Sequence, residues 1–222
     1  MRGMIFDLDG TLVDTNGAHV EAWYRSFKTL GHSVSRERIF SEIGKGSDKL
    51  PPALLGKDAD RKMIAALRRC VGEIYPELAK RRRFRVMPGA VDLLEELRRR
   101  GIRTALATSG RDDLVDATLD SARVDFRSLV DVTVTGSDAK ATKPDPDIVV
   151  TALRRLRVEP GACAMVGDTP YDGEACRAAG VRFLGVTCGG RTAAELSAAS
   201  AWDTWPEPAA LLLDVQRVLG AS

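Results

Sequence analysis

Five short apolar runs constrain what this chain can fold into more than any other feature of its sequence. Most of them are separated by segments with helical periodicity, and such an alternation indicates a parallel sheet covered by helices on both faces. The runs lie at residues 2–7, 102–108, 131–135, 162–167 and 182–187. We therefore predict an α/β fold. In the tail, residues 202–207 are expected to form a last strand or turn, followed by a packing helix.

The longest interval without an apolar run lies between the first two predicted strands and indicates a separate helical unit. Within it, apolar residues recur at the spacing of a helix with one buried face, and this helix is predicted to end or bend near Pro76. The face consists of Met63, Ile64, Leu67, Cys70, Val71, Ile74, Tyr75 and Leu78. We predict a helical domain at residues 15–86, inserted into a core of residues 1–14 and 87–222, with hinges near 14–17 and 86–89.

Two acids, Asp7 and Asp9, follow the first predicted strand, and a helix is plausible from Asp14. In parallel α/β sheets, ligands bind at the carboxyl ends of the strands. Two carboxylates this close repel each other, and a divalent cation relieves the repulsion; oxygen-only ligands favour Mg²⁺. An EF-hand calcium loop is excluded, because it requires glycine and glutamate where this chain has Leu12 and Ala18.

A second acidic pair follows the predicted strand at residues 162–167. Asp168 stands at the end of that strand, and Asp172 lies four residues later on a helix that Pro170 can start. Both side chains are therefore expected at the same edge of the sheet as Asp7, where they offer further oxygen ligands. The alternative is that the pair only caps this helix.

Two smaller signals lie between the acidic pairs. The strand at 102–108 ends in Thr108 and Ser109, whose hydroxyl and backbone donors suit a phosphate oxygen, although such residues are also common helix N-caps. Lys143 stands in a proline-flanked loop. A lone lysine is usually solvated, but beside several carboxylates it can neutralise charge on a nucleophile or a phosphate.

Taken in order, these segments resemble the four signature motifs of the haloacid dehalogenase-like (HAD) superfamily. The matching residues are Asp7-x-Asp9-Gly10-Thr11, Thr108, Lys143 and Gly167-Asp168-x-x-x-Asp172. The similarity covers nearly the whole chain. It implies a Rossmann-like, HAD-like core with an inserted α-helical (C1-type) cap, similar to phosphoglycolate phosphatases and β-phosphoglucomutases. Such a cap closes over the active site and excludes water.

The resemblance implies phosphoryl transfer to Asp7. A carboxylate with a reference pKa of about 3.9 is ionised at neutral pH, so it can attack phosphorus without an activating base and form an aspartyl-phosphate. Asp9 would protonate the leaving oxygen and later take a proton from the hydrolytic water. Haloacid dehalogenases are expected to lack an acid at this position, because halide needs no proton donor. Asp9 therefore favours phosphate chemistry.

The resemblance also implies a Mg²⁺ ion held by Asp7, Asp168 and the backbone carbonyl of Asp9, with Asp172 acting in the second layer around the ion or through water. The ion would offset the repulsion between an anionic nucleophile and an anionic phosphate. The expected donors to the phosphoryl oxygens are Thr108, the Ser109 amide and Lys143.

Substrate selection is expected in the cap, where glycines in the stretch at residues 43–48 allow the backbone to approach a ligand. Lys45, in this stretch, could meet a carboxylate or a second phosphate of the substrate; the alternative is a simple turn between helices. It is not a Walker A loop, because Lys45 is followed by glycine and no strand precedes it. His19, one turn into the first cap helix, could face the site or serve as a polar filler.

Three functions stay open on this basis. The first is a Mg²⁺-dependent phosphatase for a small phosphomonoester, such as a sugar phosphate or a phosphoglycolate-like ester. The second is a phosphomutase resembling β-phosphoglucomutase, which requires a second phosphate site, and the cap sequence shows no arginine cluster for one. The third is a non-catalytic member that binds a metabolite or a protein through the cap. The intact acidic and lysine motifs argue against this third function.

Composition narrows the classes of partner and location. Lys and Arg number 33 against 31 Asp and Glu, so no nucleic-acid partner is expected, and the basic clusters 81–83 and 98–100 are expected at helix ends. No apolar run approaches about 18 residues and the first strand begins almost at Met1, so neither a membrane span nor a signal peptide is expected. With two histidines and unpaired cysteine spacing, no zinc site is expected. We expect a cytoplasmic monomer or small homo-oligomer with reduced cysteines.

Overall fold

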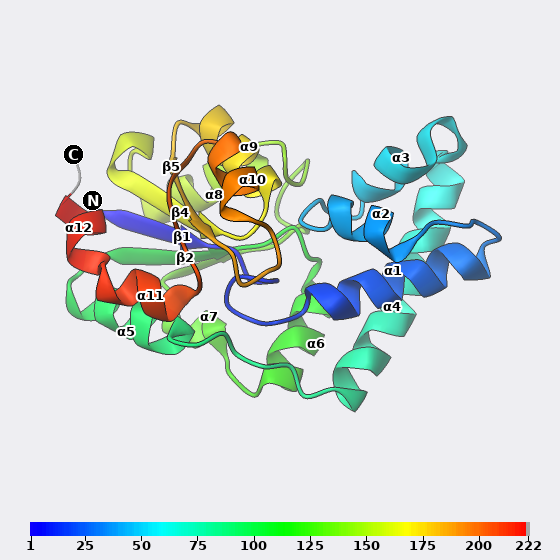
Figure 1. Ribbon diagram of the computed structural model, residues 1–222, viewed down its shortest axis with the longest axis horizontal. Coiled ribbons are helices and arrows are strands. Elements are labelled where there is room, and N and C mark those ends of the chain that lie inside the picture. The colour runs from blue at the N-terminus through cyan, green and yellow to red at the C-terminus, as the bar shows by residue number, and fades with distance from the viewer. Residues whose placement is uncertain (221–222) are drawn as a thin grey trace.

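The computed structural model describes residues 1–220 and shows a six-stranded, all-parallel sheet with the strand order β3-β2-β1-β4-β5-β6 (Figure 1). The strands are β1 (Gly3–Phe6), β2 (Arg103–Ala107), β3 (Val132–Val134), β4 (Cys163–Gly167), β5 (Arg182–Val186) and β6 (Ala201–Trp205). The first five coincide with the predicted apolar runs, and β6 lies in the tail where a strand or turn was expected. The predicted α/β fold is confirmed.

Helices cover both faces of the sheet. One face carries α5 (Ala90–Arg99), α6 (Asp112–Ala122), α7 (Phe126–Leu129) and α11 (Pro208–Leu213), and the chain ends in α12 (Val215–Gly220). The other face carries α8 (Asp147–Leu156), α9 (Pro170–Ala179) and α10 (Ala193–Ala198), after a 3₁₀ turn at Pro160–Ala162. Successive residues of β1 therefore enter different cores, Met4 and Phe6 on the first face and Ile5 on the second. Burial on both faces explains why the strands are apolar runs rather than alternating patterns.

Four helices are inserted between β1 and β2 and lie beyond the carboxyl ends of the strands (Figure 1). They are α1 (Asn16–Thr29), α2 (Arg36–Glu42), α3 (Leu50–Leu55) and α4 (Arg61–Arg81), with a 3₁₀ turn at Gly56–Asp58. We call this insertion the cap; its limits at residues 15 and 86 stay a prediction. Helix α4 packs against α1 within the cap and also against the core helix α6.

Two local expectations differ from the structure. Of the two outcomes predicted near Pro76, the end of the helix is wrong, because α4 continues to Arg81, and the bend stays a prediction. Buried side chains on both sides of the proline, such as Tyr75 and Leu78, hold the helix against its neighbours. A proline inside a helix costs about 3 kcal/mol, which this packing offsets. Helix α1 begins at Asn16 with Thr15 as its N-cap residue, and Asp14 lies outside it.

The two segments that join the cap to the core are hydrogen-bonded to each other. Val13 and Val86 form an isolated antiparallel bridge. Asp14 N donates to Arg85 O at 2.9 Å, and Met87 N donates to Leu12 O at 2.9 Å. The cap therefore enters and leaves the core through a paired connection rather than two independent loops.

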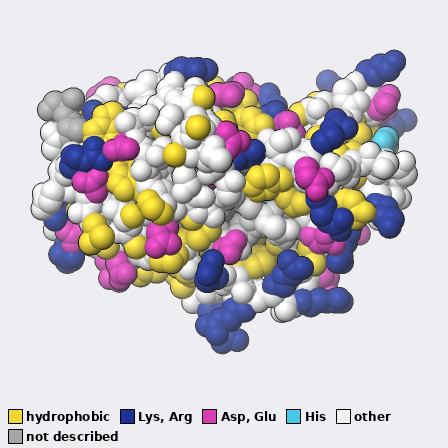
Figure 2. Space-filling view, in the orientation of Figure 1, with side chains coloured by type: hydrophobic (Ala, Val, Ile, Leu, Met, Phe, Trp, Pro, Cys, Tyr) yellow, Lys and Arg dark blue, Asp and Glu magenta, His cyan; other side chains and the backbone are white. Residues whose placement is uncertain are grey.

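The surface and the thiols carry simple features. Acidic and basic side chains are interspersed over most of the face shown in Figure 2, with a small basic group along its lower edge. Each of the four cysteines is a free thiol.

Among helices within residues 1–220, none combines the length and the apolar character needed to cross a membrane.

Gly89 provides a test of how the exit from the cap is packed. It precedes α5 with φ +73°, and a Cβ atom there would lie 2.5 Å from Ala209 Cα. Gly101 has a similar φ of +70° but open space around its Cβ position. Gly101→Ala should cost about 1–2 kcal/mol from the left-handed backbone alone. Gly89→Ala should cost a further ~1–3 kcal/mol from overpacking. Urea denaturation of the two variants measures the difference; equal costs would contradict the contact with Ala209.

Candidate active site

Three adjacent strands place the predicted motifs at one edge of the sheet. Asp7 follows β1, Thr108 follows β2 and Asp168 follows β4, and β1 lies between the other two strands. The backbone N–H of Asp7 continues the ladder by donating to Val166 O at 2.9 Å. The parallel topology therefore brings together side chains that are between 60 and 161 residues apart in the sequence.

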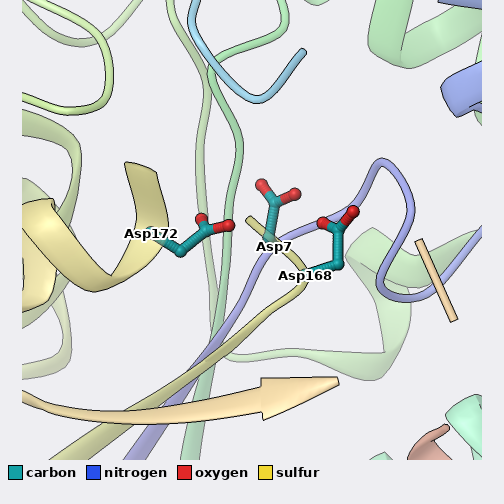
Figure 3. A group of neighbouring side chains, drawn as sticks. All are labelled: Asp7, Asp168 and Asp172. Atoms are coloured by element: carbon teal, nitrogen blue, oxygen red, sulfur yellow. The ribbon is translucent and has the colours of Figure 1, made fainter. Parts of the chain in front are cut away.

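Asp7, Asp168 and Asp172 form a buried acidic cluster. One carboxylate oxygen from each lies within 4.8 Å of the others, and all three residues are at most 5% exposed. Asp7 and Asp168 come from strand ends, whereas Asp172 projects from the first turn of α9 (Figure 3). The sequence predicted that these acids meet, and the structure confirms it.

Asp168 is held from two sides. Thr11 Oγ1 donates to its Oδ1 at 3.1 Å, and Asn16 Nδ2 donates to its Oδ2 at 2.9 Å. Burial, with the neighbouring charge of Asp172, raises the pKa of Asp168 to about 7. The carboxylate is thus fixed in orientation but short of compensating positive charge.

Lys143 lies between two of these acids. Its ammonium is 2.5 Å from Asp7 Oδ1 and 2.7 Å from Asp172 Oδ1, and the residue is 1% exposed. Burial favours the neutral amine, but Asp172 and Asp7 outweigh it and raise the pKa of Lys143, so the side chain is charged. Burial raises the pKa of Asp7 well above its usual range, even though the charge of Lys143 acts in the opposite direction.

Asp172 has a structural contact as well. Its Oδ2 accepts hydrogen bonds from Thr169 N at 3.0 Å and from Thr169 Oγ1 at 2.6 Å, which completes a capping box at the start of α9. The capping alternative is therefore correct for one oxygen of Asp172, while the other oxygen pairs with Lys143.

The donor set fits a hard divalent cation. Three carboxylates, those of Asp7, Asp168 and Asp172, lie around one ammonium group, that of Lys143, and burial raises the pKa of Asp7 and of Asp168. A cation with charge +2 bound by oxygen atoms would offset the remaining repulsion. The cluster is consistent with a metal site, and its chemistry suits Mg²⁺.

Asp9 faces the cap rather than the acidic cluster. Its Oδ1 accepts from Thr15 Oγ1 at 2.7 Å and lies 2.9 Å from His19 Nε2, and Thr108 Oγ1 donates to its Oδ2 at 3.4 Å. Burial by itself would raise the pKa of Asp9, but the charge and hydrogen bond of His19, with the hydrogen bond of Thr15, lower it. Asp9 is therefore ionised at rest, and His19 Nε2 is the donor.

The ring of Tyr75 packs against the imidazole of His19. The two rings stack with centroids 4.2 Å apart and an interplanar angle of 19°. The Tyr75 hydroxyl is hydrogen-bonded to Thr118 Oγ1 on α6 at 2.7 Å, and neither residue is accessible to solvent by more than 1%. The sequence identified Tyr75 as a core residue, which is correct, but gave no sign of its contact with His19.

A cavity of about 60 Å³ lies between the core and the cap. Since about 10–15 Å³ of such volume holds one water molecule, it has room for a phosphate-sized group and little more. From the core it is lined by Asp7, Asp9, Thr108, Ser109, Gly110, Arg111 and Leu114. From the cap it is lined by His19, Trp23, Ile43, Gly44, Lys45, Gly46 and Ser47. The buried hydroxyl of Ser109 has no hydrogen-bond partner among the described residues, so it is free to bind a ligand.

The stretch at residues 43–48 reaches the core next to Lys143. Gly46 N donates to Thr142 Oγ1 at 3.1 Å, and Thr142 also donates to the carboxylate of Asp48. A Cβ atom at Gly46 would lie 2.3 Å from Thr142 Oγ1, so the glycine is needed for this approach. Lys45 is paired with Glu42 and lies 4.5 Å from the ring centroid of Tyr171. The stretch is thus more than a turn between helices.

Sequence analysis assigned no function to Thr15, Asn16 or Tyr75, and none to Thr11 although it stands in the first motif. Thr11 could have been identified from its place beside the acids. Thr15 and Asn16 contact acids of the core where the cap begins, and Tyr75 contacts His19 because α4 packs on α1 within the cap. No local pattern in the sequence indicates these contacts.

Comparison with known proteins agrees with the motifs. Residues 1–180 match the model of a hydrolase family described as haloacid dehalogenase-like hydrolase. The chain is 33% identical to PpaX of Caldanaerobacter subterraneus, which is named as a candidate pyrophosphatase, over 84% of this chain and 81% of that protein. It is 32% identical to the phosphoglycolate phosphatase of Nitrosospira multiformis, over 85% of this chain and 84% of that protein.

Solved structures of similar proteins have the same fold as this chain. A hydrolase from Pseudomonas syringae is 28% identical with a TM-score of 0.90, covering 97% of this chain and 98% of that one. CbbY from Rhodobacter sphaeroides, solved with phosphate, is 27% identical with a TM-score of 0.78, covering 95% and 96% of the two chains. A CbbY variant has also been solved with xylulose-1,5-bisphosphate.

The excess negative charge of the acidic cluster predicts how neutralising Asp7 changes the thermal stability of the metal-free protein. Burial, together with the acidic neighbours Asp172 and Asp168, disfavours the Asp7 anion more than the charge of Lys143 favours it, and Lys143 keeps Asp172 as a partner when residue 7 is neutral. In the presence of chelator, Asp7→Asn should therefore raise the Tm, by ~2–4 °C for each kcal/mol of net destabilisation removed. Asp14→Asn is the matched control, because Asp14 is half exposed and 3.4 Å from Arg85. Thermal unfolding in EDTA provides the measurement, and a lower Tm for Asp7→Asn than for the wild type would show that the acids are already compensated.

Proposed function

This chain belongs to the haloacid dehalogenase-like hydrolases, and we propose that it is a Mg²⁺-dependent phosphatase that hydrolyses a small phosphomonoester through an aspartyl-phosphate on Asp7. One observation carries the proposal. The Asp7 carboxylate, at the tip of β1, borders a phosphate-sized cavity together with the carboxylate of Asp9 and the hydroxyl of Thr108.

In the first step the Asp7 carboxylate attacks phosphorus, and the ester oxygen leaves. Asp7 Oδ1 is bonded to Lys143, so its position is fixed before the substrate arrives. The nucleophile needs no general base, because the Lys143 ammonium, 2.5 Å from Asp7 Oδ1, favours the anionic form of this buried carboxyl.

Asp9 handles the protons in both steps. It is ionised at rest, and the approach of a phosphate dianion favours its protonation, because like charges disfavour the anionic form. The acid then donates to the leaving oxygen. In the second step it takes a proton from the water that hydrolyses the aspartyl-phosphate. His19 and Thr15 hold the carboxylate towards the cavity.

Thr108, Ser109 and Lys143 would bind the phosphoryl oxygens. Asp7, Asp168 and the Asp9 carbonyl would hold Mg²⁺, and Asp172 would act through Lys143 or water. The ion supplies electrostatic compensation between the nucleophile and the phosphate. Closure of the cap over these groups excludes bulk water from the reacting atoms.

Cavity size supports a small substrate. A phosphate fills most of the about 60 Å³, so the alcohol part must be short or must extend along the seam between the cap and the core. The outer wall contains two cationic side chains, Lys45 and Arg111, which are already paired with Glu42 and Asp113. Relatives named for phosphoglycolate are consistent with a short, anionic ester.

The direct test is release of inorganic phosphate from a panel of phosphoglycolate, sugar phosphates, pyrophosphate, nucleotides and phospho-amino acids, with Mg²⁺ and with chelator. We expect chelator-sensitive release from one or a few small esters, and less than a few per cent of that rate in Asp7→Asn. Asp14→Asn should keep the wild-type rate. Activity that survives in Asp7→Asn would exclude the aspartyl-phosphate mechanism. Conversion of a sugar 1-phosphate to its 6-phosphate without phosphate release would indicate a phosphomutase instead.

Lys45 offers a test of substrate contact in the cap. Removing its charge leaves Glu42 unpaired beside the cavity, so Lys45→Met should raise KM for an anionic ester about tenfold with a smaller change in kcat. Lys49→Met is the matched control, because Lys49 is also paired with an acid, Asp145 at 2.5 Å, but does not line the cavity. Steady-state kinetics on the best ester measure the effect, and equal KM values for the two variants would contradict a role for Lys45.

A further inference from the structure

Asn16 is the first residue of α1, where the cap begins, yet its side chain is bonded to the core. Its Nδ2 donates to Asp168 Oδ2 at 2.9 Å and to the backbone oxygen of Gly189 at 2.9 Å. The residue is 6% exposed. A single side-chain amide therefore joins the start of the cap to Asp168 of the acidic cluster and to the loop after β5.

The orientation of this amide is determined by its neighbours. Two acceptors surround one end of the side chain, so that end must be the NH₂ group; the reverse orientation would place an oxygen against two oxygens. The remaining Oδ1 is buried and has no donor among residues 1–220. A buried acceptor without a partner costs about 1–3 kcal/mol, a cost that a water molecule at the site would remove.

The surrounding backbone is shaped to admit this contact. A Cβ atom at Gly10, whose φ is +78°, would lie 2.3 Å from Asn16 Nδ2. A Cβ atom at Gly189 would lie 1.8 Å from Asp168 Oδ2. Any other residue at either position would displace the bond between Asn16 and Asp168.

We propose that Asn16 is a positioning residue that couples cation binding at the acidic cluster to the docking of the cap. It orients Asp168 for the ion, and through the same bond it ties the start of α1 to that acid. Coupling is reciprocal, so an ion that orders Asp168 must also stabilise the start of α1, and a docked cap must raise the affinity for the ion. This inference rests on the proposed function only in requiring that Asp168 contributes to a cation site.

Thr11 provides the decisive comparison. It donates to the other oxygen of Asp168 at 3.1 Å, but it belongs to the core turn after β1 and has no part in the cap. Loss of Thr11 should weaken the ion site without uncoupling it from the cap. Loss of Asn16 should do both.

The first experiment measures Mn²⁺ binding by EPR titration in the absence of substrate. Asn16→Ala and Thr11→Val should each raise the Kd by about tenfold or more, the usual range for residues that orient a metal ligand. Gly17→Ala is the matched control, since Gly17 is the next residue of α1, is exposed and has open space around its Cβ position. Its Kd should equal that of the wild type.

The second experiment measures hydrogen exchange of the α1 amides with and without saturating Mg²⁺. In the wild type, Thr11→Val and Gly17→Ala, the ion should slow exchange in α1; in Asn16→Ala this protection should disappear. Asn16→Ser serves as a second variant if the alanine variant is unfolded by circular dichroism, because serine keeps a polar group at this position but its side chain is too short to reach both acceptors.

The outcomes separate this inference from the proposed function. Wild-type Mn²⁺ affinity in the Asn16 variants, or retained Mg²⁺ protection of α1, would overturn the coupling while leaving the phosphatase proposal intact. A wild-type protein that binds no Mn²⁺ would overturn both the coupling and the proposed metal dependence.

Discussion

The burial of like charges at the carboxyl edge of the sheet is the constraint on which the rest of the active-site structure depends. Because β1 and β4 are hydrogen-bonded neighbours, Asp7 and Asp168 emerge side by side, and the first turn of α9 adds Asp172. One ammonium group, that of Lys143, is the only basic side chain in the described chain that is bonded to this cluster. Such repulsion lowers the stability of the core, a cost that is common at functional sites.

Acids of the site also hold the cap. Asp9 is hydrogen-bonded to Thr15 and His19, and Asp168 to Asn16, so three residues at the start of the cap contact two carboxylates of the site. A second connection runs from the 43–48 stretch to Thr142, beside Lys143. The groups proposed for chemistry and the groups that dock the cap are therefore the same groups. Any change in the charge of the site must alter the energy of cap docking, and the reverse also holds.

Because the site and the cap use the same side chains, only those features that depend on local sequence patterns could be predicted. The strands, and the acids that follow them, were predictable because each is a local pattern, an apolar run followed by a carboxylate, and parallel topology then brings the strand ends together. Asn16 could not be predicted, since its partner Asp168 is 152 residues away and nothing in its local sequence distinguishes it from an ordinary helix start. The sequence left open whether α4 ends or bends near Pro76, and the helix does not end there because packing against α1 and α6 overrides the local preference of proline.

Substrate choice belongs to the part of the molecule that local patterns describe least well. The groups proposed to bind the phosphate lie in the core, whereas the outer wall of the cavity combines Trp23 and Ile43 of the cap with Leu114 of the core. The cation in this wall, Lys45, is already paired with Glu42. The binding free energy that an anionic substrate would gain from Lys45 is therefore only the difference between the Lys45–substrate and the Lys45–Glu42 interactions. Under the proposed function, selectivity for anionic esters would therefore depend on how readily Glu42 releases Lys45, and Glu42 is itself hydrogen-bonded to Tyr171 of the core helix α9 at 3.4 Å. The position of the cap on the core thus controls the charge that a substrate meets as well as the volume that it can occupy.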